Sequence, residues 1–273
     1  MANGGFGVQL DLRPVRKLRP HEDTIEANTR EMVVQLRRDG IQRDPIIIDG
    51  DSGVVLDGMH RLGAFIELGI DYAACHPVDY GSSNVTVGRW LRVYRAPQSG
   101  RPRELAEAVG LTRRRAASEA FRSLDGGEAQ VAAFTGGSAL LPPVSGNIED
   151  GFAVLRSADS FAQSHEWERA FVGESEFEAH GGDESEVVVV VRRFGKEEVL
   201  KAGMVGHLFP CKTSMHMVDP RPVAVNLPLA ELEAGSTETL SRRLSEKHFE
   251  LLPPGSAYEG RRYKERLLLL SGR

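Results

Sequence analysis

A short run at an expected strand-to-helix junction, Asp57-Gly58-Met59-His60-Arg61, has residue types that can bind phosphate. Backbone N–H groups are unpaired where a helix begins, and together with the helix dipole they attract anions. Gly58 lets the backbone approach a phosphate closely, and Arg61 offers a bidentate cation for its oxygens. Asp57 could hold a divalent ion that bridges phosphates, or it could simply cap the helix. No Walker pattern occurs in the sequence, which excludes a P-loop enzyme.

Two polar loops carry side chains that could bind or activate a small substrate. Glu22, ahead of the first expected helix, could act as a general base for a hydroxyl, or could be a solvated surface acid. The loop from Lys212 to His216 combines an ammonium, two hydroxyls and an imidazole. That set suits a small anionic or zwitterionic ligand, although such a loop can also be a plain connection. Cys211 and His216 alone would make an incomplete zinc site.

The segment 103–124 has the composition of a helix-turn-helix. Gly110 would lie in the turn, and the run Arg113 to Arg115 would lie near the start of the second helix. Three consecutive arginines could bind DNA phosphates, but Ala/Arg-rich helices often show this pattern without binding DNA. Upstream of this segment, Trp90 could form the wall of a pocket or belong to the core.

Composition limits the classes of function. The chain has 273 residues, and 34 Lys+Arg against 39 Asp+Glu give a net charge of −5, so no whole-protein attraction to nucleic acid is expected. No apolar run reaches the ~18–20 residues of a membrane span, and Met1 to Gly7 is too short and glycine-rich for a signal peptide. The two cysteines, Cys75 and Cys211, exclude a disulfide scaffold and an all-cysteine metal site, and fit a reducing cytoplasm.

The elements that position these side chains indicate an α/β fold. Strands are expected over 8–12, 45–48, 54–56 and 72–78, and helices over 24–38 and 57–68. Asp23 or Thr24 would cap the first helix, and Gly69 would end the second. Further strands are expected over 131–141, 187–194 and 223–227, and further helices over 148–161 and 195–207. The stretch 171–186 is expected to be loop or edge, 209–222 irregular, and the tail mostly helix and loop.

We therefore expect three consecutive parts. An α/β domain would span 8–95, a helical segment 96–130, and a second α/β domain 131–273. The second α/β domain would carry the polar loop that begins at Lys212. No internal repeat is present.

Several stretches together resemble the ParB/sulfiredoxin-like nucleotide-binding domain. They are Leu18-Arg-Pro-His-Glu, Arg38-Asp-Gly-Ile-Gln-Arg-Asp-Pro-Ile-Ile-Ile-Asp and Val54-Val-Leu-Asp-Gly-Met-His-Arg-Leu-Gly-Ala. Within that superfamily the last stretch is similar to the free L-serine kinase (SerK) family. The later runs from Gly195 and Gly206 also look like that family, which has Phe-Pro-x-Lys-Thr-Thr-Arg-His followed by Arg-Pro. The resemblance covers roughly residues 8–95 and 185–235 and implies an α/β (α+β) fold with a ParB/sulfiredoxin-like N-terminal domain.

The resemblance implies a cytoplasmic enzyme that phosphorylates free L-serine to O-phospho-L-serine with ADP or ATP and Mg²⁺, in support of cysteine biosynthesis. Glu22 matches the family's catalytic glutamate, which takes the proton from the serine hydroxyl, and Asp57 matches an acid at the phosphate and metal site. The phosphate-binding turn is matched by Gly58, Met59, His60 and Arg61. The substrate side is matched by Trp90, Lys212, Thr213, Ser214 and His216.

This sequence departs from the related patterns at three positions. Met59 stands where sulfiredoxin has its catalytic cysteine, which excludes sulfinic-acid reduction. Ser214 replaces the second threonine of the SerK pattern and keeps the hydroxyl. Met215 replaces an arginine, so one positive charge is missing near the expected substrate site unless Arg221 supplies it.

A different class of function stays open at this point: a ParB-like, nucleotide-dependent DNA-binding regulator that reads DNA with residues 103–124. The net charge and the Lys-Thr-Ser-x-His loop favour the kinase, whereas the run Arg113 to Arg115 favours the regulator. The sequence contains no residue that distinguishes ADP from ATP, and it does not indicate an oligomeric state.

Overall fold

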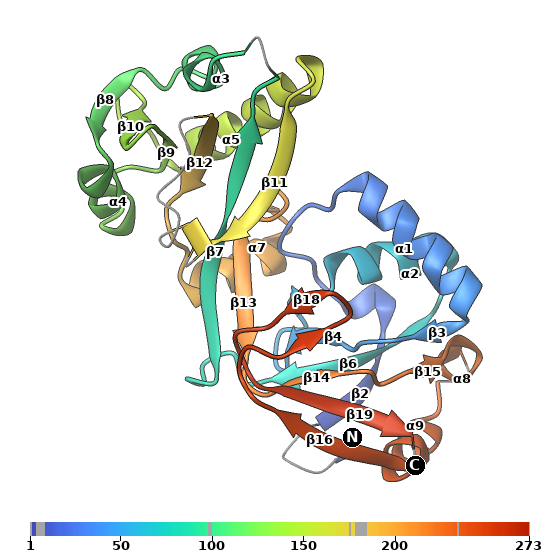
Figure 1. Ribbon diagram of the computed structural model, residues 1–273. Helices are drawn as coiled ribbons and strands as arrows, with labels where there is room; N and C mark the ends of the chain where they lie inside the picture. The colour runs from blue at the N-terminus through green and yellow to red at the C-terminus, as the bar shows by residue number, and fades with distance from the viewer. Residues whose placement is uncertain are drawn as a thin grey trace. The chain divides into compact units, whose positions relative to one another are not determined.

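The computed structural model describes residues 2–3, 9–97, 100–174, 176–177, 185–233 and 235–272 (Figure 1). It divides into two compact units that do not follow the order of the chain. Unit 1 comprises Met1–Thr86, Lys196–Cys211 and His216–Arg273, and unit 2 comprises Val87–Gly195 and Lys212–Met215. The three consecutive parts expected from sequence therefore differ from the compact bodies of the molecule, because residues after 195 return to pack with the N-terminal elements.

Unit 1 combines a mixed sheet with helices, and its elements come from the chain before and after the segment 87–195. Its elements are β1 (Ala2–Asn3), β2 (Gln9–Pro14), a short 3-10 helix (Val15–Lys17), α1 (Glu26–Asp39), β3 (Ile41–Gln42), β4 (Ile46–Asp49), β5 (Val55–Asp57), α2 (Met59–Leu68), β6 (Tyr72–Val78), α7 (Lys196–Val205), β14 (Arg221–Val223), β15 (Leu227–Pro228), α8 (Leu229–Glu233), α9 (Thr237–Ser245), β16 (Lys247–Leu252), β17 (Ala257–Tyr258), β18 (Arg261–Arg262) and β19 (Leu267–Gly272). The main sheet has the strand order β1-β2-β6-β4-β5, and α1 and α2 lie side by side next to it (Figure 1).

The N-terminal part of unit 1 confirms most of the sequence expectations. The expected strands β4 and β5 are present; β4 is buried along its whole length, forms a hairpin with β5 and pairs in parallel with β6. Helix α1 buries Val33 and Leu36 on one face, and it ends at Gly40, whose φ of 63° is the left-handed conformation of a helix C-cap. Gly69 ends α2 in the same way. Val8 of the first expected strand lies outside the described residues.

The C-terminal part of unit 1 differs from expectation. The tail was expected to be mostly helix and loop, but β16 and β19 form a sheet with β14, and β19 lies between the other two strands (Figure 1). Leu268 and Leu270 of β19 are fully buried in the same core as α1, α2 and the main sheet. A run of leucines buried inside a sheet carries no periodicity that separates it from a helix, which explains the error.

Unit 2 contains a second, largely antiparallel sheet. Its elements are β7 (Val85–Arg95), α3 (Pro102–Ala108), β8 (Arg113–Ala116), α4 (Ala117–Asp125), β9 (Val131–Thr135), β10 (Ser138–Leu141), α5 (Ile148–Ser164), β11 (Glu168–Gly173), β12 (Glu186–Val191) and β13 (Ser214–Val218), of which β7 and β13 each begin in one unit and end in the other. The strand order is β11-β7-β12-β9-β10-β8, with β13 also paired to β7. Residues 171–173, at the start of the stretch expected to be loop or edge, belong to the edge strand β11, and residues 178–184 lie outside the described residues.

The segment 96–130 contains two helices, α3 and α4, but 103–124 is not a helix-turn-helix because the strand β8 separates them. Residues Arg113 to Ala116 form an exposed edge strand that pairs with Ser138 to Leu141 of β10. The backbone of the arginine run thus finds its hydrogen-bond partners in a distant strand instead of within a helix, and three charged side chains suit an exposed sheet edge.

Within the described part of the chain, no helix is long and apolar enough to cross a membrane.

Candidate functional site

The turn between β5 and α2 has the backbone geometry of an anion site. Gly58 is the N-cap of α2 with a φ of 102°, and no side chain caps this end of the helix. Its φ favours glycine, and a Cβ at this position would lie 2.9 Å from Nη2 and 3.0 Å from Nε of Arg61, so a side chain would push the guanidinium aside. The Nε of Arg61 is buried and has no hydrogen-bond partner in the structure. A buried donor beside an uncapped helix N-terminus favours an anionic ligand here.

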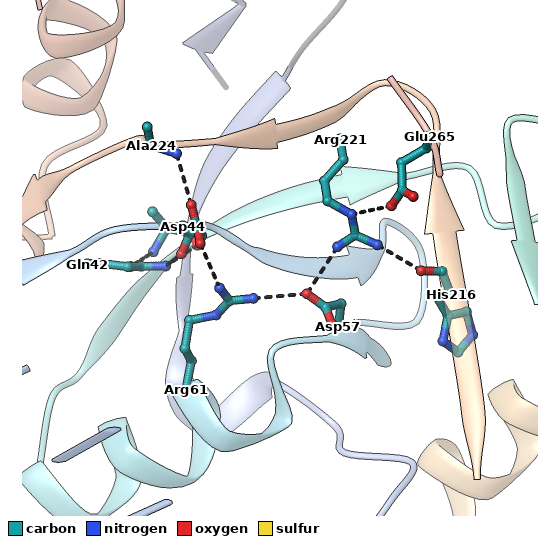
Figure 2. A network of polar contacts seen from close by, with 9 residues as sticks. Gln42, Asp44, Asp57, Arg61, His216, Arg221, Ala224 and Glu265 are labelled. Atoms are coloured by element: carbon teal, nitrogen blue, oxygen red, sulfur yellow. Dashed lines mark hydrogen bonds and ion pairs between the residues drawn. The ribbon is translucent and has the colours of Figure 1, made fainter. Parts of the chain in front are cut away.

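The carboxylate of Asp57 is held by two arginines (Figure 2). Arg61 donates from Nη2 to Oδ2 of Asp57 at 3.0 Å, and Arg221 donates from Nη1 to the same oxygen at 3.1 Å. Arg221 also donates from Nε to Glu265 at 2.6 Å and from Nη2 to the carbonyl of His216 at 2.7 Å. Burial would lower the pKa of Arg221, but Asp57 and Glu265 raise it, so its charge is secure.

Arg221 was expected to replace a missing arginine at the substrate. In the structure it is 3% exposed, and each of its three side-chain nitrogens has a protein acceptor. This arrangement fits a residue that fixes Asp57 and the start of β14.

A second group of polar side chains lies buried around Glu22. Glu22 is 7% exposed, and its Oε1 lies 3.5 Å from Nε2 of His21. The ring of His21 packs edge-on against that of His216 at 5.3 Å between centroids. Tyr80 places its hydroxyl 2.7 Å from Nε2 of His216. The interpretation of Glu22 as a solvated surface acid is therefore wrong.

The surroundings of His216 connect this group with the turn from Asp57 to Arg61. The pKa of His216 is lowered to about 3, chiefly by burial and then by nearby His21, with Glu22 and Asp57 opposing the shift. His216 is consequently neutral at physiological pH. Arg221 binds both the Asp57 carboxylate and the His216 carbonyl, and the His216 ring packs on that of His21, so unit 1 brings Glu22 and Asp57 into the same neighbourhood.

His60 has a structural contact that the sequence did not indicate. The backbone N–H of Ile25 donates to Nε2 of His60 at 3.1 Å, and Ile25 is the N-cap of α1. The expected capping by Asp23 or Thr24 is wrong, because the acceptor comes from a residue 35 positions away. Met59 packs against the core of unit 1.

Unit 2 assembles the remaining expected substrate residues. The Nζ of Lys212 lies 4.9 Å from the centre of the Trp90 ring, a cation–π contact. The N–H of Trp90 donates to the carbonyl of Thr213 at 3.3 Å, and Arg92 donates to the carbonyl of Lys212 at 3.5 Å. Lys212 has a φ of 53°, unusual for a residue with a side chain. Thr213 and Ser214 are buried.

Few side chains of this site could bind Mg²⁺. Among the described residues no group of three or more His, Cys, Asp or Glu side chains could by itself hold a metal. Mg²⁺ commonly uses one or two carboxylates together with substrate phosphates and water. The carboxylate of Asp57, next to the turn that begins at Gly58, is compatible with an ion of that kind.

The sequence is similar to several characterised proteins, although no family model matches it. A ParB-like protein of Sulfolobus acidocaldarius is 41% identical over 91 residues, which is 33% of this chain and 45% of that protein. An ATP-dependent L-serine kinase of Staphylothermus marinus is 22% identical over 83% of this chain and 92% of the relative. The ADP-dependent L-serine kinase SerK of Thermococcus kodakarensis is 23% identical over 82% and 91%.

Solved structures show the same fold. A free serine kinase in complex with AMP superposes with a TM-score of 0.68 at 22% identity, covering 85% of this chain and 95% of the other. SbnI from Staphylococcus aureus, truncated at its C-terminus, has a TM-score of 0.64 at 15% identity, over 86% and 95%. The mixed α/β fold expected from the resemblance is thereby confirmed.

Proposed function

We propose that this chain, a member of the free serine kinase family by sequence and fold, transfers a phosphoryl group from ADP or ATP to the hydroxyl of free L-serine. The observation that carries the proposal is the buried carboxylate of Glu22 in the same neighbourhood as the turn from Asp57 to Arg61. A kinase needs a carboxylate for the acceptor hydroxyl and cations for the transferred phosphate, and unit 1 contains both.

The phosphates of the nucleotide would bind at the start of α2. The N–H groups after Gly58 and the guanidinium of Arg61 face the oxygens, and the buried Nε of Arg61 gains an acceptor. Asp57, fixed by Arg61 and Arg221, is the residue that would hold Mg²⁺. When bound, that ion spreads the negative charge that develops on the phosphate oxygens.

Glu22 would act as the general base. A serine hydroxyl is a weak nucleophile at neutral pH, so a positioned carboxylate that accepts its proton speeds the attack on phosphorus. The acceptor O–H bond breaks, the new O–P bond forms, and the bond to the leaving phosphate of the nucleotide breaks. Glu22 is held for this task by its burial and by the backbone bridge with Phe209.

The substrate contacts follow from the polar loop. Lys212 supplies a cation for the carboxylate of serine, and the hydroxyls of Thr213 and Ser214 supply hydrogen bonds. Trp90 supports the Lys212 ammonium. His216 is neutral, so it contributes a hydrogen bond and no charge. Because Met215 carries no charge, Lys212 provides the principal positive charge of this loop.

The experiment is a product assay. The purified protein is incubated with Mg²⁺, L-serine and one nucleotide, in separate reactions with ADP, ATP or CTP. O-phosphoserine is then measured by mass spectrometry. We expect product with ADP or ATP. In Glu22→Gln the rate of O-phosphoserine formation should fall at least about a hundredfold. Glu26→Gln is the matched control, because Glu26 has a side chain 79% exposed and should keep full activity. No product with any nucleotide, or full activity in Glu22→Gln, would contradict the proposal.

A further inference from the structure

Resting on the proposed function, we infer that Arg261, in the hairpin of β17 and β18 near the C-terminus, is a further residue that binds the phosphates of the nucleotide. The hairpin runs from Ala257 to Arg262 and belongs to unit 1, as does the turn that begins at Gly58. The phosphate contacts proposed for that turn do not involve the hairpin.

The tip of the hairpin is fixed beside the segment that reaches Arg61. Glu259 and Gly260 form the two-residue turn, and both have positive φ, 47° and 76°. Glycine adopts this conformation readily, but a glutamate does so rarely. The carboxylate of Glu259 accepts from Nη1 of Arg43 at 2.7 Å. The next residue, Asp44, has a carboxylate oxygen 3.6 Å from Nη1 of Arg61.

The base of the hairpin is fixed beside the arginine that holds Asp57. Tyr263 follows β18 and continues its pairing, because its N–H donates to the carbonyl of Ser256 at 3.0 Å and its carbonyl accepts from Gly255 at 2.7 Å. The side chain of Tyr263 is 9% exposed. The Cζ of Arg221 lies 5.8 Å from the centre of the Tyr263 ring. Arg221 in turn donates to Oδ2 of Asp57 (Figure 2). The Tyr263 ring therefore borders the Asp57 cluster.

Arg261 lies against the same ring. Its Cζ is 4.6 Å from the centre of the Tyr263 ring. Side chains of an extended strand alternate between its two faces, so Arg261 and Tyr263 share a face and Arg262 belongs to the other. The shared face is the one that meets Arg221. A guanidinium stacked on an aromatic ring keeps the N–H groups at its edge available to an anion.

The charges around the turn favour one more cation when a nucleotide binds. Arg61 and Arg221 together contact three carboxylates, so these two guanidiniums are already more than balanced by acids of the protein. Arg261 is exposed and, among the described residues, has no ion pair. A nucleoside di- or triphosphate brings several further negative charges, and guanidinium binds phosphate oxygens in bidentate geometry. The position and the charge of Arg261 therefore both fit the phosphates of the nucleotide.

A matched pair of variants tests this contact. Arg261→Ala removes a guanidinium from an exposed position, where a substitution should leave the fold intact. Arg262→Ala is the control, because it removes the same charge from the next residue, whose Nη1 donates to the carbonyl of Gly255 at 2.8 Å. Calorimetric titration uses two probes, ADP and inorganic pyrophosphate, and only ADP carries a nucleoside.

We expect Arg261→Ala to weaken the binding of both probes about tenfold and by the same factor, because only a phosphate contact is lost. In the product assay the KM for the donor nucleotide should rise by a similar factor, while the KM for serine stays within about twofold. Arg262→Ala should bind both probes within about twofold of the parent, since the contact with Tyr263 and the phosphates is unchanged.

Unchanged pyrophosphate affinity in Arg261→Ala would overturn the inference, even if ADP binds more weakly, because the contact would then be to the nucleoside. Equal weakening in both variants would overturn it as well, since the effect would come from the net charge of the hairpin. A parent that does not bind pyrophosphate would also contradict it. Failure of the proposed function is distinguishable, because the parent would then form no O-phosphoserine, whatever its affinity for either probe.

Discussion

Replacing Gly58 by alanine tests whether the turn before α2 is the phosphate site. The new Cβ would lie 2.9 Å from Nη2 of Arg61, so the guanidinium must move away from Asp57. An L-residue in the left-handed region costs about 1–2 kcal/mol. Losing the charge-assisted hydrogen bond between Arg61 and Asp57 adds about 1.5–3 kcal/mol. The free energy of unfolding should therefore fall by about 2.5–5 kcal/mol in total.

Gly69 provides a matched control at the other end of the same helix. It has a φ of 69°, and nothing lies within 4 Å of the position of its Cβ. Gly69→Ala should therefore show only the backbone cost of about 1–2 kcal/mol. The difference between the two variants isolates the displacement of Arg61, since the backbone cost is common to both.

The assay combines denaturant unfolding with calorimetric titration of nucleotide at a temperature where both variants are folded. Gly58→Ala should weaken nucleotide binding at least about tenfold, equivalent to 1.4 kcal/mol, whereas Gly69→Ala should bind as the parent does. Equal nucleotide affinity in the parent and Gly58→Ala would refute the assignment of the phosphates to this turn. Equal loss of affinity in both variants would show that the helix as a whole was disturbed.

Three further predictions concern other parts of the chain. Arg221→Ala should lower the free energy of unfolding by about 3–5 kcal/mol, because it leaves two carboxylates without their buried cation. Arg266→Ala, at an exposed ion pair, should lower it by only about 0–1 kcal/mol. Urea unfolding measures both values. Since burial lowers the pKa of His216 from 6.5 to about 3, the unfolded chain binds the extra proton in this window. Stability should fall as pH drops below 6.5, by up to about 1.4 kcal/mol per pH unit from this group, and His216→Asn should flatten that slope in unfolding measured across pH. Burial raises the pKa of Cys75 to about 12, so a thiol reagent should modify the half-buried Cys211 in the native protein and reach Cys75 only after unfolding, as peptide mass mapping would show.

Local sequence patterns were sufficient where the determining contacts are also local. The helix end at Gly69 was predicted from glycine's access to positive φ, and this glycine adopts it, as does Gly40 after the first helix. Strands β4 and β5 were predicted from two apolar runs on either side of a polar turn, and Asp49 closes that turn by accepting from Ser52.

Patterns failed where a distant residue supplies the partner. At the N-terminus of α1, the backbone N–H of Ile25 donates to His60, and no motif near residue 25 predicts that contact. The arginines of β8 pair with β10 because the strand offers their backbone a ladder, although their composition suits a helix. Likewise Tyr80 and His216 lie 136 positions apart, and only the fold makes them neighbours.

The chain order of unit 1 has a consequence for biosynthesis. The core that surrounds β4 and α2 is completed by side chains such as Val225, Leu240 and Leu268, which the ribosome adds after the whole of 87–195. An emerging N-terminal segment therefore exposes apolar surface that its own residues cannot cover. Unit 2 consists mainly of one continuous stretch and can form earlier. A nascent chain of this protein is thus expected to depend on holding factors until its last strand, β19, has been released.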